Sequence, residues 1–339
     1  MTTATAPHRS PSPAPQASFE LLSPQLRDRP EVLAERFGTA RPFRHLVLDG
    51  FLREDAARAL LEQFPPFERG NRMSENGTEG RKSTVEKIRE LGPAFVALDD
   101  LVRSEHFLGW LSCATSIPDL LYDPWYFGGG THENLDGQDL DVHVDFNRHP
   151  VTGWHRRLNL IVYLNPDWDE GWGGALELHR DPRSEHDEVR IINPVFNRCV
   201  IFETTEWSWH GFSPIRLPSS AQGRSRRSVA LYFYTRERPV EELAPAHSTI
   251  YVDRPLPDRF RAGYRLAEED VQELRVLLAR RDQHIRRLYE ERMRASTQEA
   301  PAARPRNLLA DAAVRVLRPL ASRLPAGIRE PLRRWWRRR

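Results

Sequence analysis

Apolar and polar positions change their spacing twice along the chain. Residues 43–111 combine a short strand-like run, His45 to Leu52, with apolar side chains at helical spacing. From Pro118 to about Thr235, short apolar runs are separated by Gly, Asn, Asp and Pro, a pattern typical of antiparallel strands. A helical pattern returns after Pro245. The spacing therefore predicts an α+β protein with its strands in the middle of the sequence.

The two ends of the chain differ in composition from the middle. Residues 1–18 are rich in Pro, Ser, Thr and Ala and have few apolar side chains, so burial cannot offset the entropy cost of ordering them. We expect a disordered tail at 1–18, a main domain at 19–240, an extension with a helix at 241–294, and a linker and basic tail at 295–339.

The extension carries an apolar row at alternating steps of three and four, interrupted by Arg281: Val271, Leu274, Leu278, Ile285 and Leu288. The row is too short to define a coiled coil. Two interpretations remain open: a helix docked on its own domain, and a short helix that forms a homodimer through residues 266–290.

Charge and cysteine content argue against some classes of protein. Lys and Arg total 50 against 48 Asp and Glu, so the net charge of +2 gives no overall attraction to nucleic acid. Cys113 and Cys199 are far apart and in no C-x-x-C motif, which disfavours a disulfide scaffold or a cysteine zinc site, and we expect both to be buried and reduced. No basic leader precedes an apolar run, so the default expectation is a cytoplasmic protein.

The basic tail changes this expectation in one respect. Residues 311–339 contain nine Arg against Asp311 and Glu330, with apolar anchors that end in Trp335 and Trp336. We hypothesise weak contact with an anionic membrane surface, which would make the protein peripheral to the membrane. A solvated basic tail is the alternative of equal weight.

Three residues form a candidate metal site. His143 and Asp145 lie two apart among apolar neighbours, so in an extended segment both side chains leave the same face. His210 follows the buried-looking strand 199–202 and has aromatic neighbours that would exclude water. Two imidazoles and one carboxylate suit iron(II) and leave three positions open. An exposed His and Asp on an ordinary strand is the alternative, because H-x-D alone is a weak motif.

Five motifs occur in order: H-V-D, Y-L-N-x-x-W, G-G-x-L, W-H-G-F and R-S-V-A-L-Y-F-Y. Together they resemble the prolyl 4-hydroxylase-like branch of the 2-oxoglutarate- and Fe(II)-dependent oxygenases, over residues 43–234. The resemblance implies a double-stranded β-helix, a jelly-roll-like barrel buttressed by N-terminal helices and followed by the C-terminal helix and basic tail. It also implies that His143, Asp145 and His210 bind Fe(II).

The same resemblance implies two residues that bind 2-oxoglutarate. Arg227 begins the last strand, and a cation there projects into an apolar barrel only if an anion awaits it. The resemblance makes that anion the distal carboxylate of 2-oxoglutarate, with Tyr163 donating a further hydrogen bond. The alternatives are a core tyrosine and a solvated basic turn. We expect Arg224 and Arg226, in a loop rich in Ser and Gly, to be solvated.

A glycine-rich loop, residues 127–134, precedes the H-x-D strand where such oxygenases place a substrate-facing loop. We consider His132 and Asn147 as substrate contacts, with turn-stabilising roles as the alternative. His155 and His179 fall outside the triad pattern and are expected to be surface or structural residues.

The implied activity is hydroxylation with O2 and 2-oxoglutarate, releasing succinate and CO2, with ascorbate as a reductant. A peptidyl proline or another residue in a peptide is the favoured substrate, and a free small molecule or sugar is the alternative, because loops around the barrel decide what enters. Two rivals remain: a cupin-type enzyme that binds zinc, and a degenerate oxygenase-fold domain that serves as a binding module.

Overall fold

The computed structural model describes residues 19–27, 29–73, 79–253 and 256–299. The tail predicted for residues 1–18 and the basic tail of 311–339 lie outside the described residues. The described residues divide into two units between residues 277 and 278, and the candidate site lies in the first.

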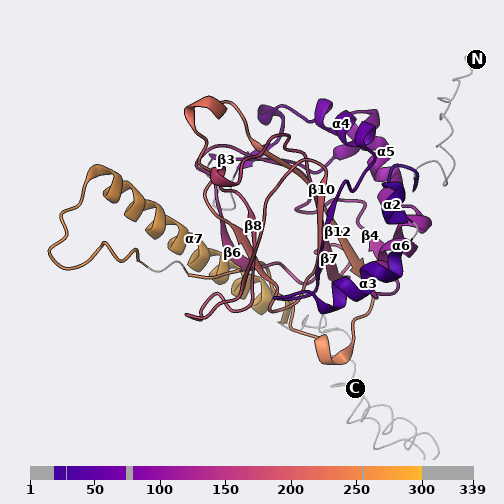
Figure 1. Ribbon diagram of the computed structural model, residues 1–339. Coiled ribbons are helices and arrows are strands. Elements are labelled where there is room, and N and C mark those ends of the chain that lie inside the picture. Colours follow the sequence, from indigo (N-terminus) through magenta and orange to yellow (C-terminus); the bar gives the residue numbers. More distant parts are fainter. Residues whose placement is uncertain (1–18, 28, 74–78, 254–255, 300–339) are drawn as a thin grey trace, which may run out of the picture. The chain divides into compact units, whose positions relative to one another are not determined.

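Two antiparallel sheets form the centre of the first unit (Figure 1), which confirms the predicted α+β class. The larger sheet has the strand order β1 (His45–Asp49), β10 (Arg198–Glu203), β7 (His155–Tyr163), β12 (Arg226–Thr235), β5 (Gly130–Asn134), β3 (Glu79–Val85) and β2 (Asn71–Met73), and β4 (Leu121–Tyr122) also pairs with β12. The smaller sheet has the order β13 (Ile250–Tyr251), β6 (Leu140–Val144), β11 (Trp209–Phe212), β8 (Leu176–His179) and β9 (Val189–Ile192).

Helices from the first third of the chain contribute to the main apolar cluster: α2 (Pro24–Arg27), α3 (Pro30–Thr39), α4 (Glu54–Glu62), α5 (Pro93–Val102) and α6 (Glu105–Thr115). The start of α6 is capped by Ser104, whose hydroxyl accepts the Phe107 N–H at 3.2 Å. The short 3₁₀ helices lie in connections: η1 (Phe67–Arg69), η2 (Ile88–Glu90), η3 (Glu170–Trp172), η4 (Ser219–Ala221) and η5 (Val240–Glu242).

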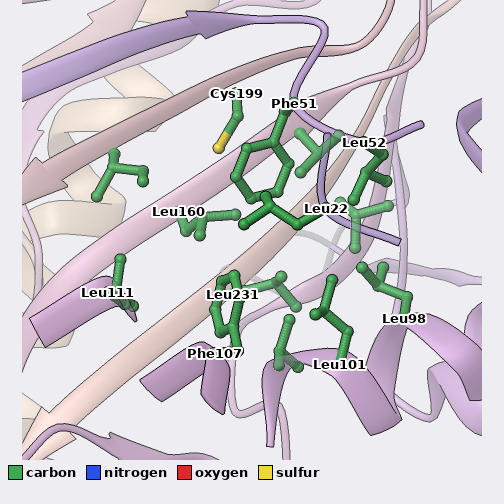
Figure 2. Close-up of a cluster of buried hydrophobic side chains, with 14 of the residues drawn as sticks. Leu22, Phe51, Leu52, Leu98, Leu101, Phe107, Leu111, Leu160, Cys199 and Leu231 are labelled. Atoms are coloured by element: carbon green, nitrogen blue, oxygen red, sulfur yellow. The ribbon is translucent and has the colours of Figure 1, made fainter. Parts of the chain in front are cut away.

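The main apolar cluster lies between these helices and one face of the larger sheet. Figure 2 shows Leu160, Cys199 and Leu231, from three adjacent strands, in this cluster: Leu231 lies next to Phe107 of α6, and Cys199 lies next to Phe51. Cys199 is buried there as expected. The expectation for Cys113 is wrong, because this residue is exposed. It lies off the helical face that α6 buries through Phe107, Trp110, Leu111 and Ala114.

A second apolar cluster joins the two sheets. Tyr163, Val200 and Phe202 come from the larger sheet, and Leu176, Leu178 and Ile192 come from the smaller one. The larger sheet is therefore buried on both faces, by helices on one side and by the smaller sheet on the other. This arrangement places the candidate site between the two sheets.

The C-terminal helix α7 (Glu268–Glu299) begins at three acidic residues, which favour a helix N-terminus. Asp270 stabilises this end by accepting the Ala267 N–H at 2.8 Å. The helix continues to Glu299, so residues 295–299, which we expected at the start of a linker, are helical. Among the described residues, no helix combines the length and apolar character that crossing a membrane requires.

Candidate metal and anion site

The structure brings His143, Asp145 and His210 together between the sheets. Strands β6 and β11 pair antiparallel with His143 directly opposite His210, and Asp145 follows the end of β6. Potential ligand atoms of the three side chains all lie within 4.8 Å of one another. Both histidines are buried. The group can therefore converge on one metal ion.

Each histidine has one ring nitrogen committed to the backbone. Nδ1 of His143 lies 2.8 Å from the Asp141 carbonyl oxygen, and Nδ1 of His210 lies 2.9 Å from that of Ser208. A carbonyl can only accept, so Nδ1 carries the proton and the Nε2 lone pair is available for a metal. The two Nε2 atoms lie 3.6 and 3.4 Å from the Asp145 carboxylate oxygens.

The charge states also fit a metal site. Burial lowers the pKa of His210 to about 4, so its imidazole is neutral near pH 7. Burial alone would raise the pKa of Asp145, but Arg156 and the two histidines hold it well below its ordinary value. A neutral imidazole and an ionised carboxylate are the forms that bind metals.

A buried cation lies in the same interior. Arg226, at the start of β12, is only 4% exposed. Its Nε donates to the Gly174 carbonyl at 2.7 Å, and its Nη2 donates to the Tyr163 hydroxyl at 3.3 Å. No carboxylate in the described part of the chain forms an ion pair with Arg226, and burial lowers the pKa of its guanidinium. An unpaired buried cation is costly, so this group favours an anionic ligand.

Arg226 also has a defined relation to the triad. Its guanidinium carbon lies 4.2 Å from the ring centroid of Phe212, two residues after His210 on β11. Side chains two apart on a strand share a face, and their Cα atoms are about 7 Å apart. The Arg226 guanidinium therefore lies against Phe212, which is the next side chain after His210 on the same face of β11.

The predicted position of Arg227 is wrong. Its side chain points to the opposite face of β12, where Nε donates to Glu133 Oε1 at 3.0 Å and the side chain is 37% exposed. The guanidinium lies over the ring of Phe64, outside the space between the sheets. Adjacent residues on a strand face opposite ways, so one step of register exchanges the roles of Arg226 and Arg227.

The other predicted residues divide into two groups. Tyr163 is fully buried between the sheets and contacts Arg226. His132 lies on β5 opposite Ser228, and its buried Nε2 has no hydrogen-bond partner in the described chain. Asn147 instead makes chain contacts: its amide donates to the Pro245 carbonyl at 2.8 Å and accepts the His247 N–H at 3.1 Å. This geometry favours a structural role for Asn147 over contact with substrate.

Asn147 helps to fasten a C-terminal segment beside the triad. His247 Nε2 lies 2.8 Å from Glu206 Oε2, and β13 pairs with β6 so that Tyr251 lies opposite His143. The two rings are 5.2 Å apart between centroids. The sequence patterns did not indicate Tyr251, because a two-residue strand has no periodicity to detect.

His155 and His179 lie outside the triad, as expected. His179 Nδ1 is 2.7 Å from Asp187 Oδ2, and Asp187 also accepts the backbone N–H groups of Arg180 and Asp181. His179 therefore anchors the start of a surface loop.

Comparisons with known proteins agree with this site. Residues 130–234 match the model of the 2OG-Fe(II) oxygenase superfamily. Mouse prolyl 3-hydroxylase OGFOD1 is 34% identical over 83 residues, which are 23% of this chain and 14% of that protein. The Xenopus laevis protein of the same name is 33% identical over 88 residues, 25% of this chain and 16% of that one. The chain thus matches only a small part of these curated relatives.

Two solved structures are similar at low identity. One is a Trichoplax adhaerens prolyl hydroxylase in complex with a hypoxia inducible factor peptide fragment, with 16% identity and a TM-score of 0.45 over 62% of this chain and 90% of that chain. The other, described among prolyl 4-hydroxylases from Phytophthora capsici, has 16% identity and a TM-score of 0.42 over 96% of this chain and 95% of that chain.

The matched segment contains the triad, Tyr163 and Arg226. Over residues 130–234 the chain therefore matches the 2OG-Fe(II) oxygenase superfamily, a group named for Fe(II) and 2-oxoglutarate. The resemblance to prolyl hydroxylase-like oxygenases is confirmed over this segment.

Proposed function

We propose that the protein is an Fe(II)- and 2-oxoglutarate-dependent dioxygenase that hydroxylates an organic substrate and releases succinate and CO2. One observation carries the proposal: a buried arginine, for which the described residues provide no carboxylate partner, lies in the same interior as a cluster of two histidines and one carboxylate. Either feature alone has ordinary structural explanations. Together they provide a metal site and an anion site within one small molecule's length.

The donor set fits Fe(II). His143, Asp145 and His210 would hold the ion through two Nε2 atoms and one carboxylate oxygen, which leaves three positions for other ligands. When bound, Fe(II) with 2-oxoglutarate and O2 supplies the oxidising chemistry. The chain orients both histidine rings through the Asp141 and Ser208 carbonyls and keeps His210 neutral by burial.

Arg226 and Tyr163 would bind the distal carboxylate of 2-oxoglutarate. A guanidinium matches a carboxylate in shape and charge, and the Tyr163 hydroxyl already accepts from Arg226, so its own proton is available to an anion. The Cα atoms of His210 and Phe212 are about 7 Å apart along β11. This separation suits 2-oxoglutarate, a five-carbon diacid that would bind Arg226 at one end and the metal at the other. This cation also argues against the two rivals, the cupin-type zinc enzyme and the binding module, because neither needs a buried anion site beside the metal.

For the substrate, we propose a proline residue in a peptide. The support is the family segment and its likeness to a relative named as a prolyl 3-hydroxylase. A free small molecule or sugar is the alternative substrate class, and ascorbate is the proposed reductant.

The test is succinate release from labelled 2-oxoglutarate in protein loaded with Fe(II), across proline-containing peptides, free amino acids and nucleotide sugars, with mass spectrometry for a gain of one oxygen. We expect turnover that Asp145→Ala abolishes. Turnover confined to free small molecules would reject the peptide substrate and keep the iron chemistry. No metal binding and no turnover would reject the enzyme.

A further inference from the structure

Arg156, which the sequence patterns did not indicate, lies beside the triad. It is on β7 and is 1% exposed. Its Nη2 lies 3.2 Å from Oδ2 of Asp145, the candidate carboxylate ligand. A fully buried arginine costs desolvation energy, so its contacts within the site need an explanation.

Asn159 links Arg156 to the same carboxylate. Arg156 Nε and Nη2 donate to Asn159 Oδ1 at 3.0 and 2.7 Å, and Asn159 Nδ2 donates to Asp145 Oδ2 at 2.7 Å. Because the guanidinium can only donate, it fixes which end of the Asn159 amide faces it, and the NH2 end must then face Asp145. The three side chains form a closed ring of contacts.

Two aromatic rings restrain the guanidinium itself. Its central carbon lies 3.6 Å from the ring centroid of Tyr232 and 4.4 Å from that of Phe146. Such contacts hold a planar cation more firmly than they would a lysine ammonium. Arg156 is therefore fixed in both position and plane.

The two carboxylate oxygens of Asp145 therefore have different contacts. Each Asp145 oxygen lies near one histidine, Oδ1 at 3.6 Å from His143 Nε2 and Oδ2 at 3.4 Å from His210 Nε2. Only Oδ2 is also contacted by both Arg156 and Asn159. We propose that Arg156 is a positioning residue for the metal site, which acts with Asn159 to commit Oδ2 so that Asp145 binds a metal ion through Oδ1 alone. One-oxygen binding leaves the three remaining positions of the ion open. This inference rests on the proposed function only in requiring that the triad binds a metal.

Direct titration with Co(II) tests this role without substrate or 2-oxoglutarate. The affinity of the protein for Co(II) reports on the ligands that hold the ion. The visible absorption of the bound Co(II) reports on the number and arrangement of those ligands. We expect Arg156→Gln to lower Co(II) affinity about 10- to 100-fold, the usual effect of losing a group that orients a metal ligand, and to change the absorption spectrum. Arg156→Lys, which keeps the charge without the planar fork, should recover part of the affinity and not the wild-type spectrum.

Arg157→Gln is the matched control. Arg157 is also buried but pairs with Glu203 and Glu242, away from Asp145. We expect its variant to keep wild-type Co(II) affinity and spectrum even if it unfolds at lower temperature. Equal Co(II) affinity and spectra in folded Arg156→Gln and wild type would overturn the proposal, as would full recovery of both by lysine.

If Arg156→Gln does not fold, Asn159→Leu provides a second test, because it removes the amide that links Arg156 to Oδ2. We expect the same loss of Co(II) affinity, and unchanged affinity would overturn the proposal. The two hypotheses fail differently. Wild-type Co(II) binding that depends on Arg156, without any 2-oxoglutarate turnover, would contradict the proposed function alone.

Discussion

The outer face of β12 carries Val229, Leu231 and Phe233, which pack in the apolar cluster shared with the helices. The inner face carries Arg226, Ser228, Ala230 and Tyr232, which face the space between the sheets. Both faces are largely buried, yet one is filled by large apolar side chains and the other by small or polar ones. The strand thus has a stabilising side and a side available for chemistry.

This difference has an energetic reason. Burying an aliphatic or aromatic side chain contributes about 1.5–3 kcal/mol, and it requires no particular partner. A buried polar group stabilises the fold only when it finds a specific partner. The outer face can therefore support the position of the inner face. Directed contacts hold Arg226 there, and Arg156 on the neighbouring strand β7.

The largest expected effect comes from the outer face. Phe233 is 1% exposed, and its ring centroid lies 6.1 Å from that of Phe107. Phe233→Ala should lower the free energy of unfolding by about 3–5 kcal/mol, because it leaves a cavity that packing only partly refills. Urea denaturation measures this change. A loss below about 1 kcal/mol would contradict a stabilising role for this face.

On the inner face, Arg226→Ala should weaken 2-oxoglutarate binding by about 2–5 kcal/mol, because it removes one side of a desolvated charge pair. Co(II) affinity in the absence of 2-oxoglutarate should change little. The measurement is the 2-oxoglutarate KM together with direct binding to metal-loaded protein. A wild-type KM in a folded Arg226→Ala variant would disprove the anion site.

The next prediction concerns the pH dependence of stability and the buried His132, which pairs with Ser228 of β12. Burial, followed by the charge of Lys82, holds the pKa of His132 well below its ordinary 6.5. The unfolded state then binds more protons than the folded state below pH 6.5, so stability falls as the pH drops through that window, by at most about 1.4 kcal/mol per unit. Denaturation at pH 5, 6 and 7 should show a shallower dependence for His132→Gln. Identical slopes would contradict a neutral buried His132.

The smallest effect belongs to Arg227, the neighbour of Arg226. Its ion pair with Glu133 is partly exposed, and Ser225 also donates to that carboxylate. Arg227→Ala should cost less than about 1 kcal/mol of stability and leave the 2-oxoglutarate KM unchanged. A rise in that KM equal to the rise for Arg226→Ala would show that the two faces are not distinct.

Much of the fold was predictable because local spacing carries it. The strand texture of residues 118–235, the helices before it and the helix after residue 266 all follow from apolar periodicity. The pairing of strands was not predictable in this way. Tyr251 reaches His143 only because β13, more than a hundred residues later in the chain, adds to the edge of β6.

The sequence by itself determined which side chains form the triad. His143 and Asp145 share a face by the two-residue repeat of a strand, and His210 follows from its strand context.

Only the tertiary structure decided between the tandem arginines. Hydrophobic alternation reveals which way a strand faces when one side is solvated, but β12 and β7 are buried on both sides, so alternation could not show that Arg226, and not Arg227 as predicted, faces the interior. On β7 an irregularity pairs Tyr234 with Arg156 directly after Phe233 with Leu158, so it is Arg156 rather than Arg157 that contacts Asp145. Such a register shift is set by the partner strand, and the spacing of residues within β7 does not contain it.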